Sequence, residues 1–328
     1  MHKKLPPGAL TLIRTCIGPD FTATPIPGGQ HATFHILGPV EAILKVFPAQ
    51  YSGFDVEQAA LELIRTGLAG WPVVVPEVYG SGSDADGRYL LLSFFLSRSL
   101  AEAIRIPEFR RRHALVEAAE TLGRIHSIAS RLAEAATGMF PVDRLAGLGR
   151  IGQPDFDGLC ERVRQGSRVV GAERIGGAIR ALEAHRTILE AVCAPIHLVH
   201  GDYQPKNLLI ARHGAALVAV IDWELTCLSS PIRDLATLLR FCDDLSTEDA
   251  VLEAYPALPW TREMTRVGAR CFDLARVAVG MSTVRSTTSD TPAWLEFVDA
   301  TIEYLAAGAH ERLRRAAAAL ILFESSGS

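Results

Sequence analysis

The segment Val199–Leu209 reads VHGDYQPKNLL, and shortly after it the chain reads IDWE at 221–224. These two stretches place an aspartate at 202, an asparagine at 207 and a second aspartate at 222. The second aspartate directly follows the apolar run LVAVI at 217–221, which has the length and composition of a buried strand. We therefore expect Asp222 at the mouth of a strand, where a ligand can reach its carboxylate.

The residue types and spacing at these positions suit phosphoryl transfer from a nucleoside triphosphate. One aspartate can accept or orient the attacking hydroxyl, while an asparagine and a second aspartate supply hard oxygen ligands for Mg²⁺. Asp202 alone could be a turn residue that caps its own loop. Its intervals to Asn207 and Asp222 favour the catalytic interpretation.

A lysine in the N-terminal part supports the same chemistry. Lys45 lies within AILKVF at 42–47, and strand alternation places it on one face with Ile43 and Phe47. A lysine on an apolar strand face is rarely left unpaired. We expect it to meet a carboxylate, a phosphate group or both.

Two glutamates of the next helical segment, 55–68, compete for this lysine. At about 100° per residue, the apolar positions of the segment form one arc, and Glu57 falls inside that arc. Glu62 falls on the opposite side with polar residues. We predict that Glu57 faces Lys45 and that Glu62 is solvated.

Three motifs together resemble the aminoglycoside phosphotransferase and choline kinase superfamily, the small-molecule relatives of protein kinases. They are HGDxxxxN at 200–207, IDWE at 221–224 and PIRDLA at 231–236. The resemblance implies an α+β, bilobal protein-kinase-like fold. Residues 1–96 would form a small nucleotide-binding lobe, made of an antiparallel β-sheet and one key helix. Residues 97–328 would form a larger, mainly helical lobe for catalysis and substrate binding.

The resemblance also implies roles for individual residues. Asp202 would be the catalytic base or hydroxyl-orienting residue, and Asn207 and Asp222 would bind Mg²⁺. Lys45, paired with Glu57, would bind the phosphates of ATP or GTP. His200 would hold the backbone of the catalytic loop.

Further nucleotide contacts would come from backbone groups. The loop 27–33 would cover the phosphates through Gly28 and Gly29, although paired glycines between strands also form plain hairpin turns. Adenine would hydrogen-bond to the joint between the lobes, at Ser93, Phe94, Phe95 and Leu96.

Asp234 has two interpretations. With Ser230 as N-cap and Pro231 at the first helical position, it is a favourable acid near a helix N-terminus. By the resemblance it is a buried support for the catalytic loop, and the sequence leaves both open. His126 is interpreted as a structural histidine.

Two departures argue against a protein kinase. Gln204 stands where Ser/Thr protein kinases carry a lysine, and Trp223-Glu224 replaces the Phe-Gly of their metal motif. Because of the second departure we expect no mobile switch of the DFG type, and the sequence contains neither an APE segment nor a recognisable activation loop.

The predicted elements follow from periodicity and turn residues. Strands are expected at 22–26, 33–37, 42–47, 73–79, 88–95, 196–200, 208–211 and 217–221, with a turn at 81–87. Helices are expected at 55–68, 108–132 and 172–192, and Ser99–Glu102 fits a capping box.

Composition narrows the partners and the compartment. The 328 residues carry 33 basic and 37 acidic side chains, a net charge of −4, which argues against electrostatic nucleic-acid binding. No stretch approaches the ~20 apolar residues of a membrane helix. Six cysteines without CxxC spacing fit a reducing cytoplasm. We expect a cytoplasmic protein that binds neither nucleic acid nor membrane, with an oligomeric state that the sequence leaves open.

The acceptor is the least defined part of the prediction. Cationic acceptors, such as aminoglycosides or amino alcohols, favour an acidic pocket, and the stretch DDLSTED at 243–249 offers four acids. The candidate acceptor contacts in it are Asp243, Asp244 and Glu248. The stretch also fits a helix start at Ser246. Further acids that the sequence does not rank are Asp155, Asp157, Glu161, Asp273 and Asp290.

The leading hypothesis is an ATP- or GTP-dependent O-phosphotransferase that acts on a small hydroxylated molecule. The resemblance favours an antibiotic such as an aminoglycoside. A metabolic kinase of an amino alcohol, amino acid or sugar would share every motif. A non-catalytic nucleotide-binding protein usually lacks the lysine, aspartate or asparagine, and none is lost here.

Overall fold

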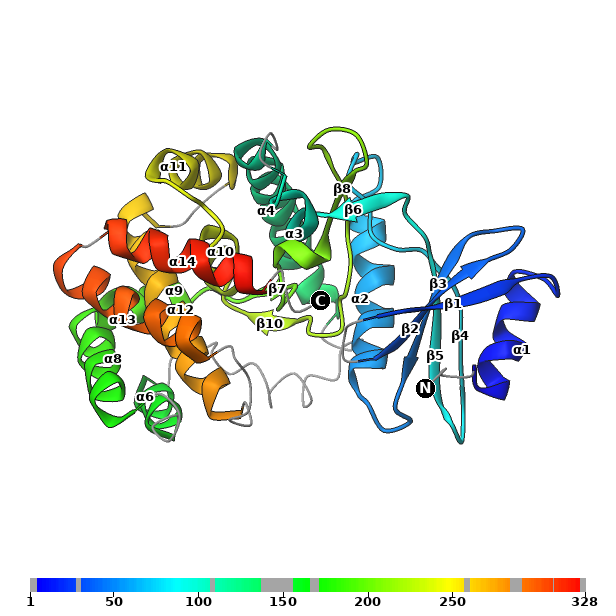
Figure 1. Cartoon of the computed structure of the whole chain (residues 1–328), viewed down its shortest axis with the longest axis horizontal. Helices are drawn as coiled ribbons and strands as arrows, with labels where there is room; N and C mark the ends of the chain where they lie inside the picture. Colours follow the sequence, from blue (N-terminus) through cyan, green and yellow to red (C-terminus); the bar gives the residue numbers. More distant parts are fainter. Residues whose placement is uncertain are drawn as a thin grey trace.

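A computed structural model of the protein describes residues 5–27, 31–106, 110–136, 156–165, 171–256, 260–283, 291–308 and 310–324. The chain forms two lobes: a smaller one built on a sheet, and a larger one built mainly of helices (Figure 1). This agrees with the predicted α+β, bilobal architecture.

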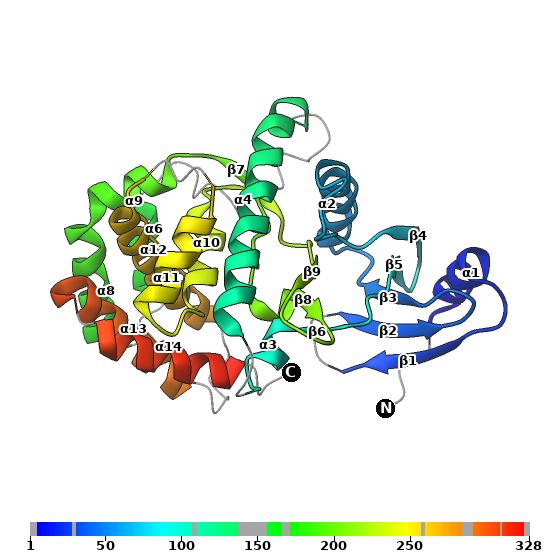
Figure 2. The same ribbon diagram turned by 90° about the horizontal axis from the view of Figure 1, so that it is seen from above.

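The N-terminal lobe is a five-stranded antiparallel sheet in the order β1-β2-β3-β5-β4. Its strands are β1 (Thr22–Ile26), β2 (Ala32–Leu37), β3 (Ala42–Phe47), β4 (Val78–Asp84) and β5 (Gly87–Ser93). Helix α1 (Pro7–Cys16) packs on the sheet away from the helical lobe, and α2 (Gly53–Gly67) lies between the sheet and that lobe (Figures 1 and 2).

The alternation of β3 separates two hydrophobic cores. Leu44 is fully buried in the cluster beneath α1. Ile43 and Phe47 belong to the main core on the other face, as the sequence pattern predicts for the face of Lys45. In the ladder, Lys45 lies opposite Thr33 of β2 and Leu90 of β5, so it is carried by the centre of the sheet.

The strand expected at 73–79 is wrong for its first part. Pro72 and Pro76 lack backbone N–H donors and are unsuited to a ladder, and β4 begins only at Val78. Val74 instead forms an isolated parallel bridge to Ala219 in the helical lobe. The segment therefore ties the two lobes together.

The expected turn at 81–87 is narrower than predicted. Strand β4 continues to Asp84, whose Oδ1 accepts hydrogen bonds from the backbone N–H groups of Asp86 and Gly87 at 2.8 and 3.2 Å. This is the turn geometry that an aspartate side chain favours. Helix α1 lies in a region where we predict neither a helix nor a strand from the sequence. Pro7 at its first position suits a helix start.

The C-terminal lobe contains ten helices among the described residues. They are α3 (Leu100–Ala103), α4 (Arg111–Ala136), α6 (Phe156–Gln165), α8 (Ala172–Ala184), α9 (Arg186–Cys193), α10 (Ile232–Leu239), α11 (Leu245–Ala254), α12 (Arg262–Thr283), α13 (Thr291–Ala307) and α14 (His310–Glu324). The capping box of Ser99 and Glu102 is present at α3.

The single helix expected at 172–192 is two helices. The chain leaves helical geometry at His185, with φ −112° and ψ 19°. The ring of His185 is hydrogen-bonded through Nε2 to the carbonyl oxygen of Leu305 at 2.8 Å, a contact with α13 that no local pattern reveals.

Short strands and one 3₁₀ turn carry the site. Strand β6 (Ser97–Ser99) pairs with β8 (Leu208–Ala211), which pairs with β9 (Leu217–Val220), and β7 (His197–Val199) pairs with β10 (Cys227–Ser229). A 3₁₀ turn spans Pro205–Asn207. The predicted lobe boundary after residue 96 falls just before β6. Across the described residues, no helix combines the length and hydropathy needed to cross a bilayer.

Candidate active site

The loop between β7 and β8 is held by one buried carboxylate, Asp234 of α10. Its Oδ2 accepts a 2.7 Å hydrogen bond from the backbone N–H of His200, and its Oδ1 accepts a 2.9 Å bond from that of Gly201. Asp234 is fully buried. Of the two interpretations of Asp234, this geometry favours the one in which its buried carboxylate supports the loop that carries Asp202.

Asp234 is itself fixed by a buried histidine. Nε2 of His126 on α4 lies 3.1 Å from Asp234 Oδ2, and its Nδ1 lies 2.6 Å from the hydroxyl of Tyr255. Burial raises the pKa of Asp234, but the hydrogen bond from His126 and nearby positive charges outweigh it and hold the pKa below its ordinary value. His126 thus has a structural position, as the sequence suggests.

The ring of His200 braces the same loop from inside. Its Nε2 lies 3.0 Å from the carbonyl oxygen of Ile221, and its Nδ1 accepts the backbone N–H of Asp202 at 3.2 Å. Burial lowers the pKa of His200, which agrees with a neutral ring that donates through Nε2 and accepts through Nδ1.

Asp202 is surrounded by donors and cations. Its Oδ2 accepts hydrogen bonds from Gln204 Nε2 at 2.7 Å and from Asn207 Nδ2 at 3.1 Å. Lys206 Nζ lies 3.4 Å from Oδ2, and Arg276 Nη2 lies 3.4 Å from Oδ1. Burial raises the pKa of Asp202, but Lys206, the Gln204 hydrogen bond and Arg276 outweigh it, so the pKa is below its ordinary value. The carboxylate is ionised at neutral pH.

Lys45 joins the two lobes at the site. Its Nζ donates to Glu57 Oε2 at 2.7 Å and to Asp222 Oδ1 at 2.6 Å. Burial lowers the pKa of Lys45. The charges of Glu57 and Asp222 raise it by more than burial lowers it, so the net shift is upward. The charged lysine therefore contacts Glu57, the partner expected from the sequence, and also Asp222, which the sequence analysis does not place beside it.

Asp222 adopts an unusual backbone conformation. Its φ of 68° makes it the one non-glycine residue with positive φ in the described part of the chain. Such a conformation costs of order 1–3 kcal/mol and persists where the surroundings over-determine it, often at functional sites. It turns the Asp222 carboxylate from the end of β9 toward Lys45.

Sequence reasoning missed two further residues at this site, His31 and Glu224. His31 Nε2 lies 3.0 Å from Glu224 Oε2, in an orientation that makes neither atom a hydrogen-bond partner of the other. Burial, followed by the charge of Asp222, raises the pKa of Glu224 to about 7. The second acid of IDWE was the available signal for Glu224.

The donor set suits a hard divalent cation. Carboxylate oxygens of Glu57, Asp222 and Glu224 lie within 4.8 Å of one another. Glu57 Oε1 and Glu224 Oε2 are buried without a hydrogen-bond partner in the described part of the chain. Asn207 uses its amide nitrogen to bind Asp202, which leaves its amide oxygen as a possible ligand. Oxygen-only donors of this kind match Mg²⁺.

Comparison with models of protein families shows which family the chain belongs to. The model of the phosphotransferase enzyme family matches residues 22–264, well over half of the chain. The chain belongs to this family. No curated protein sequence matches it.

Several solved phosphotransferases have a similar fold. A GDP complex of an aminoglycoside 2′-phosphotransferase of type IIIa is 16% identical, with 97% of each chain covered and a TM-score of 0.56. The macrolide 2′-phosphotransferase of Brachybacterium faecium is 18% identical, with 95% of this chain and 96% of that chain covered and a TM-score of 0.56. An aminoglycoside phosphotransferase of Streptomyces rimosus, in complex with ADP and streptomycin, is 19% identical, with 84% and 97% covered and a TM-score of 0.54. At these identities the likeness establishes the fold.

Other predicted positions of this phosphotransferase are placed as follows. Glu62 is exposed, opposite to the buried Glu57. Gly28 and Gly29 lie outside the described residues. In the joint between the lobes, the backbone N–H of Ser93 already donates to Glu77 at 2.9 Å.

The remaining joint residues, Phe94, Phe95 and Leu96, differ in their surroundings. The rings of Phe94 and His35 lie 4.6 Å apart and are tilted, the carbonyl oxygen of Phe95 accepts a hydrogen bond from the Ser97 hydroxyl, and Leu96 is 68% exposed.

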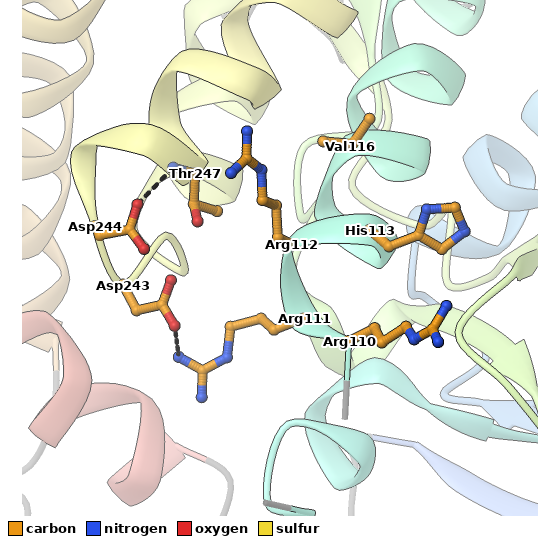
Figure 3. A pocket seen from close by; sticks show the side chains of 8 residues that line it. All are labelled: Arg110, Arg111, Arg112, His113, Val116, Asp243, Asp244 and Thr247. Carbon is orange, nitrogen blue, oxygen red and sulfur yellow. Dashed lines mark hydrogen bonds and ion pairs between the residues drawn. The ribbon is translucent and has the colours of Figure 1, made fainter. Parts of the chain in front are cut away.

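The acidic stretch 243–249 is already paired, which weakens its interpretation as an acceptor pocket. Asp243 lies 3.3 Å from Arg111, and Asp244 is the N-cap of α11, where it accepts the backbone N–H of Thr247 (Figure 3). Glu248 is buried and forms ion pairs with Arg266 and Arg270. The helix start is real but begins at Asp244, two residues before the predicted Ser246.

A cavity of about 610 Å³ lies between the starts of α4 and α11. It is lined by Arg110, Arg111, Arg112, His113, Val116, Asp243, Asp244 and Thr247 (Figure 3). Arg111 pairs with Asp243, and Arg110 and Arg112 line the same cavity, so the surface that carries the two aspartates offered as contacts for a cationic acceptor is not acidic.

The unranked acids have separate outcomes. Asp273 is fully buried and pairs with Arg240 at 2.6 Å, while Glu161 is exposed and pairs with Arg164 at 3.4 Å. Asp155 and Asp290, and the side chain of Asp157, lie outside the described part of the structure.

Proposed function

We propose that this phosphotransferase transfers the γ-phosphate of ATP or GTP to a hydroxyl group of a small molecule. The observation that carries the proposal is the convergence of Lys45, Asp222 and Asn207 on the catalytic loop of Asp202. This set contains a charged lysine for the phosphates, oxygen ligands for a metal ion and an ionised carboxylate for the acceptor, as phosphoryl transfer requires.

Each residue acts from a fixed position in the proposed reaction. Lys45, held by Glu57, neutralises charge on the nucleotide phosphates. Asp202 accepts a hydrogen bond from the acceptor hydroxyl and orients it for in-line attack. Asn207 and Asp222, with Glu224 beside them, would hold Mg²⁺, which supplies charge neutralisation between the phosphates. Positioning and electrostatics dominate such reactions.

Asp202 needs support from the loop to do this. Asp234 and His200 accept the backbone N–H groups of Gly201 and of Asp202 itself, so the carboxylate is placed before an acceptor arrives. Its lowered pKa agrees with an ionised carboxylate that accepts a hydrogen bond from the acceptor hydroxyl. This fits a transition state in which little proton transfer is needed before the phosphoryl group moves.

For the acceptor, an antibiotic such as an aminoglycoside or a macrolide is the first hypothesis to test. It is supported by the solved structures of similar fold, which are aminoglycoside and macrolide phosphotransferases. A metabolic kinase of an amino alcohol, an amino acid or a sugar is the alternative. We further infer a cytoplasmic location, where nucleoside triphosphates are available and where the six free cysteines would stay reduced.

The test is release of nucleoside diphosphate with Mg-ATP and with Mg-GTP. The acceptor panel contains aminoglycosides, macrolides, peptide antibiotics, choline, ethanolamine, homoserine and simple sugars, followed by a small-molecule extract of the host cell. The Asp202→Asn variant is the blank. Acceptor-dependent release in the wild type that is absent in Asp202→Asn supports the proposal. Release that persists in the variant, or none with any acceptor or extract, contradicts it.

A further inference from the structure

Arg276 of α12 contacts the carboxylate that would orient the acceptor. Its Nη1 donates to Thr237 Oγ1 at 2.9 Å, and its Nη2 donates to Asp202 Oδ1 at 3.4 Å. Arg276 keeps 35% of its side chain exposed. A guanidinium has five N–H donors, so these two bonds leave it able to bind a further oxyanion.

The contact lies on the side from which an acceptor must approach. Attacking and leaving oxygens are roughly in line in phosphoryl transfer, so the acceptor reaches the phosphate from the side opposite to the rest of the nucleotide. Lys45 and Asp222 mark the phosphate side. Arg276 comes from α12 in the helical lobe, far from the sheet that carries Lys45 (Figure 1). It donates to Oδ1 of Asp202, whereas Gln204 donates to Oδ2.

Cationic side chains lie close to Asp202 and to Arg276. Lys206 and Arg276 both pair with this one carboxylate. Arg233, one turn before Thr237, has no carboxylate within 4.0 Å among the described residues and donates to Cys227 Sγ at 3.0 Å. Its neighbour Asp234 is occupied by the backbone of the catalytic loop and by His126.

Charges of both signs act on Arg276. Burial lowers the pKa of Arg276, and the charges of Arg240 and Arg233 lower it further, while Asp202 and Asp273 raise it. The net shift of the pKa of Arg276 is downward, and a bound anion would stabilise the charged guanidinium.

Three of the described acids that the sequence offered as contacts for a cationic acceptor already have arginine partners. Asp273 pairs with Arg240, and Glu248 pairs with Arg266 and Arg270. Asp243 pairs with Arg111. In the described part of the helical lobe these acids therefore have cationic partners, and Arg276 is paired with Asp202 itself.

We propose that the acceptor carries an oxyanion, a carboxylate or a phosphate ester, which binds Arg276 beside the hydroxyl that Asp202 orients. The inference rests on the proposed kinase function and narrows its substrate to hydroxylated anions. Planar guanidinium groups bind carboxylate and phosphate oxygens in pairs, so Arg276 would fix both the position and the orientation of the acceptor. The inference favours sugar acids and sugar phosphates over aminoglycosides.

One other role for Arg276 must be separated from this one. An arginine near the reaction centre could instead stabilise the phosphoryl group in transit. That role would be equal for every acceptor, whereas recognition of the acceptor changes the preference between charged and uncharged acceptors. The ratio of rates is therefore the informative quantity.

The first experiment measures binding and does not depend on turnover. The enzyme saturated with Mg-ADP is titrated by calorimetry with inorganic phosphate, gluconate, glucose 6-phosphate, glucose and glucosamine. We expect an anion to bind in preference to glucose and glucosamine, and Arg276→Gln to weaken it by about 30-fold or more, as for a charged hydrogen-bonded pair that loses one partner. Arg276→Lys should fall between, because it keeps the charge but not the fork.

A matched control is Arg315→Gln on α14, an arginine whose side chain is 74% exposed; it should leave binding unchanged. Thermal unfolding of each variant shows whether it is folded. If no anion binds in an Arg276-dependent manner to a folded enzyme, the inference is overturned.

The second experiment uses turnover and separates the inference from the proposed function. A small-molecule extract is split on anion and cation exchangers at neutral pH, and each fraction is assayed for nucleoside-diphosphate release that is absent in Asp202→Asn. Activity in the anion-exchanger fraction that falls selectively in Arg276→Gln supports the inference. Activity in another fraction, or an equal loss for all acceptors in Arg276→Gln, overturns it and leaves the kinase intact. Arg276-dependent anion binding without any Asp202-dependent release contradicts the kinase function and leaves an anion site.

Discussion

Nζ of Lys45 on β3 donates a 2.7 Å hydrogen bond to Oε2 of Glu57 on α2. Glu57 is fully buried, and the lysine side chain is 12% exposed. The same ammonium group reaches Asp222 of the helical lobe at 2.6 Å. Glu57 therefore fixes the position from which Lys45 acts across the lobe boundary.

We predict that Glu57→Gln lowers kcat/KM for the nucleotide by about 30-fold or more, because removing one charge of a buried hydrogen-bonded pair costs roughly 2–5 kcal/mol. The reason is loss of lysine positioning, so both kcat and KM should change. Steady-state kinetics with varied Mg-ATP at a fixed acceptor concentration measures this.

Glu62→Gln on the same helix is the control, because Glu62 is exposed. It should stay within about twofold of the wild type, since surface substitutions change free energies by about 0.5 kcal/mol or less. Equal kinetics for the two variants would remove Glu57 from the site.

The parts of the site that the sequence could predict are those with a local pattern. Alternation along 42–47 places Lys45 with Ile43 and Phe47, and the helical arc of 55–68 separates Glu57 from Glu62. The order of Asp202, Asn207 and Asp222 indicates one loop and one strand end. These patterns depend on neighbours a few residues away, which is the range over which backbone periodicity acts.

The parts that it could not predict depend on contacts between distant segments. Arg276 reaches Asp202 from a helix 74 residues later in the chain, and an arginine on a helix is usually solvated. The acids at 243–249 read as a pocket because their arginine partners, on α4 and α12, cannot be seen from the stretch itself. The position of His31 opposite Glu224 has the same origin.

Asp234 should contribute more to stability than an ordinary surface acid. It accepts two backbone N–H groups of the catalytic loop and contacts His126. Hydrogen bonds to a charged group contribute about 1.5–3 kcal/mol each, so we expect Asp234→Asn to lower the free energy of unfolding by about 3 kcal/mol and to reduce turnover. Urea unfolding at neutral pH is the measurement.

The matched control is Asp299→Asn. Asp299 forms a partly exposed pair with Arg174 at 2.8 Å, and such pairs contribute about 1 kcal/mol or less. If Asp234→Asn is no more destabilising than Asp299→Asn, the loop does not depend on Asp234.

The contribution of Asp234 should also depend on pH. Its pKa is lowered in the folded protein, so the folded state binds this proton less readily than the unfolded chain. The stabilisation is therefore complete above the unfolded value of about 3.9 and is lost as the pH falls through the lower, folded value.

We expect a constant difference in unfolding free energy between wild type and Asp234→Asn from about pH 5 to 8, and a shrinking difference below about pH 4. Urea titrations at stepwise lower pH measure it. A difference that stays the same into the acid range would mean that the charge of Asp234 is not what holds the loop.

Gly201 should tolerate no side chain, and Gly214 provides the comparison. Both have positive φ, of +86° and +110°. A Cβ on Gly201 would lie 2.1 Å from the backbone oxygen of Leu225, whereas a Cβ on Gly214 would meet nothing within 4 Å. Gly214→Ala should therefore cost only the conformational strain, of order 1–3 kcal/mol, and leave turnover unchanged.

Gly201→Ala carries the same strain and must also displace the loop that places Asp202. Because a shift of about 1 Å at a reacting group can cost ~10²-fold in rate, we expect turnover to fall by at least about tenfold even where urea unfolding shows that the variant is folded. Equal turnover in the two variants would show that the close approach of Gly201 to Leu225 does not position the catalytic carboxylate.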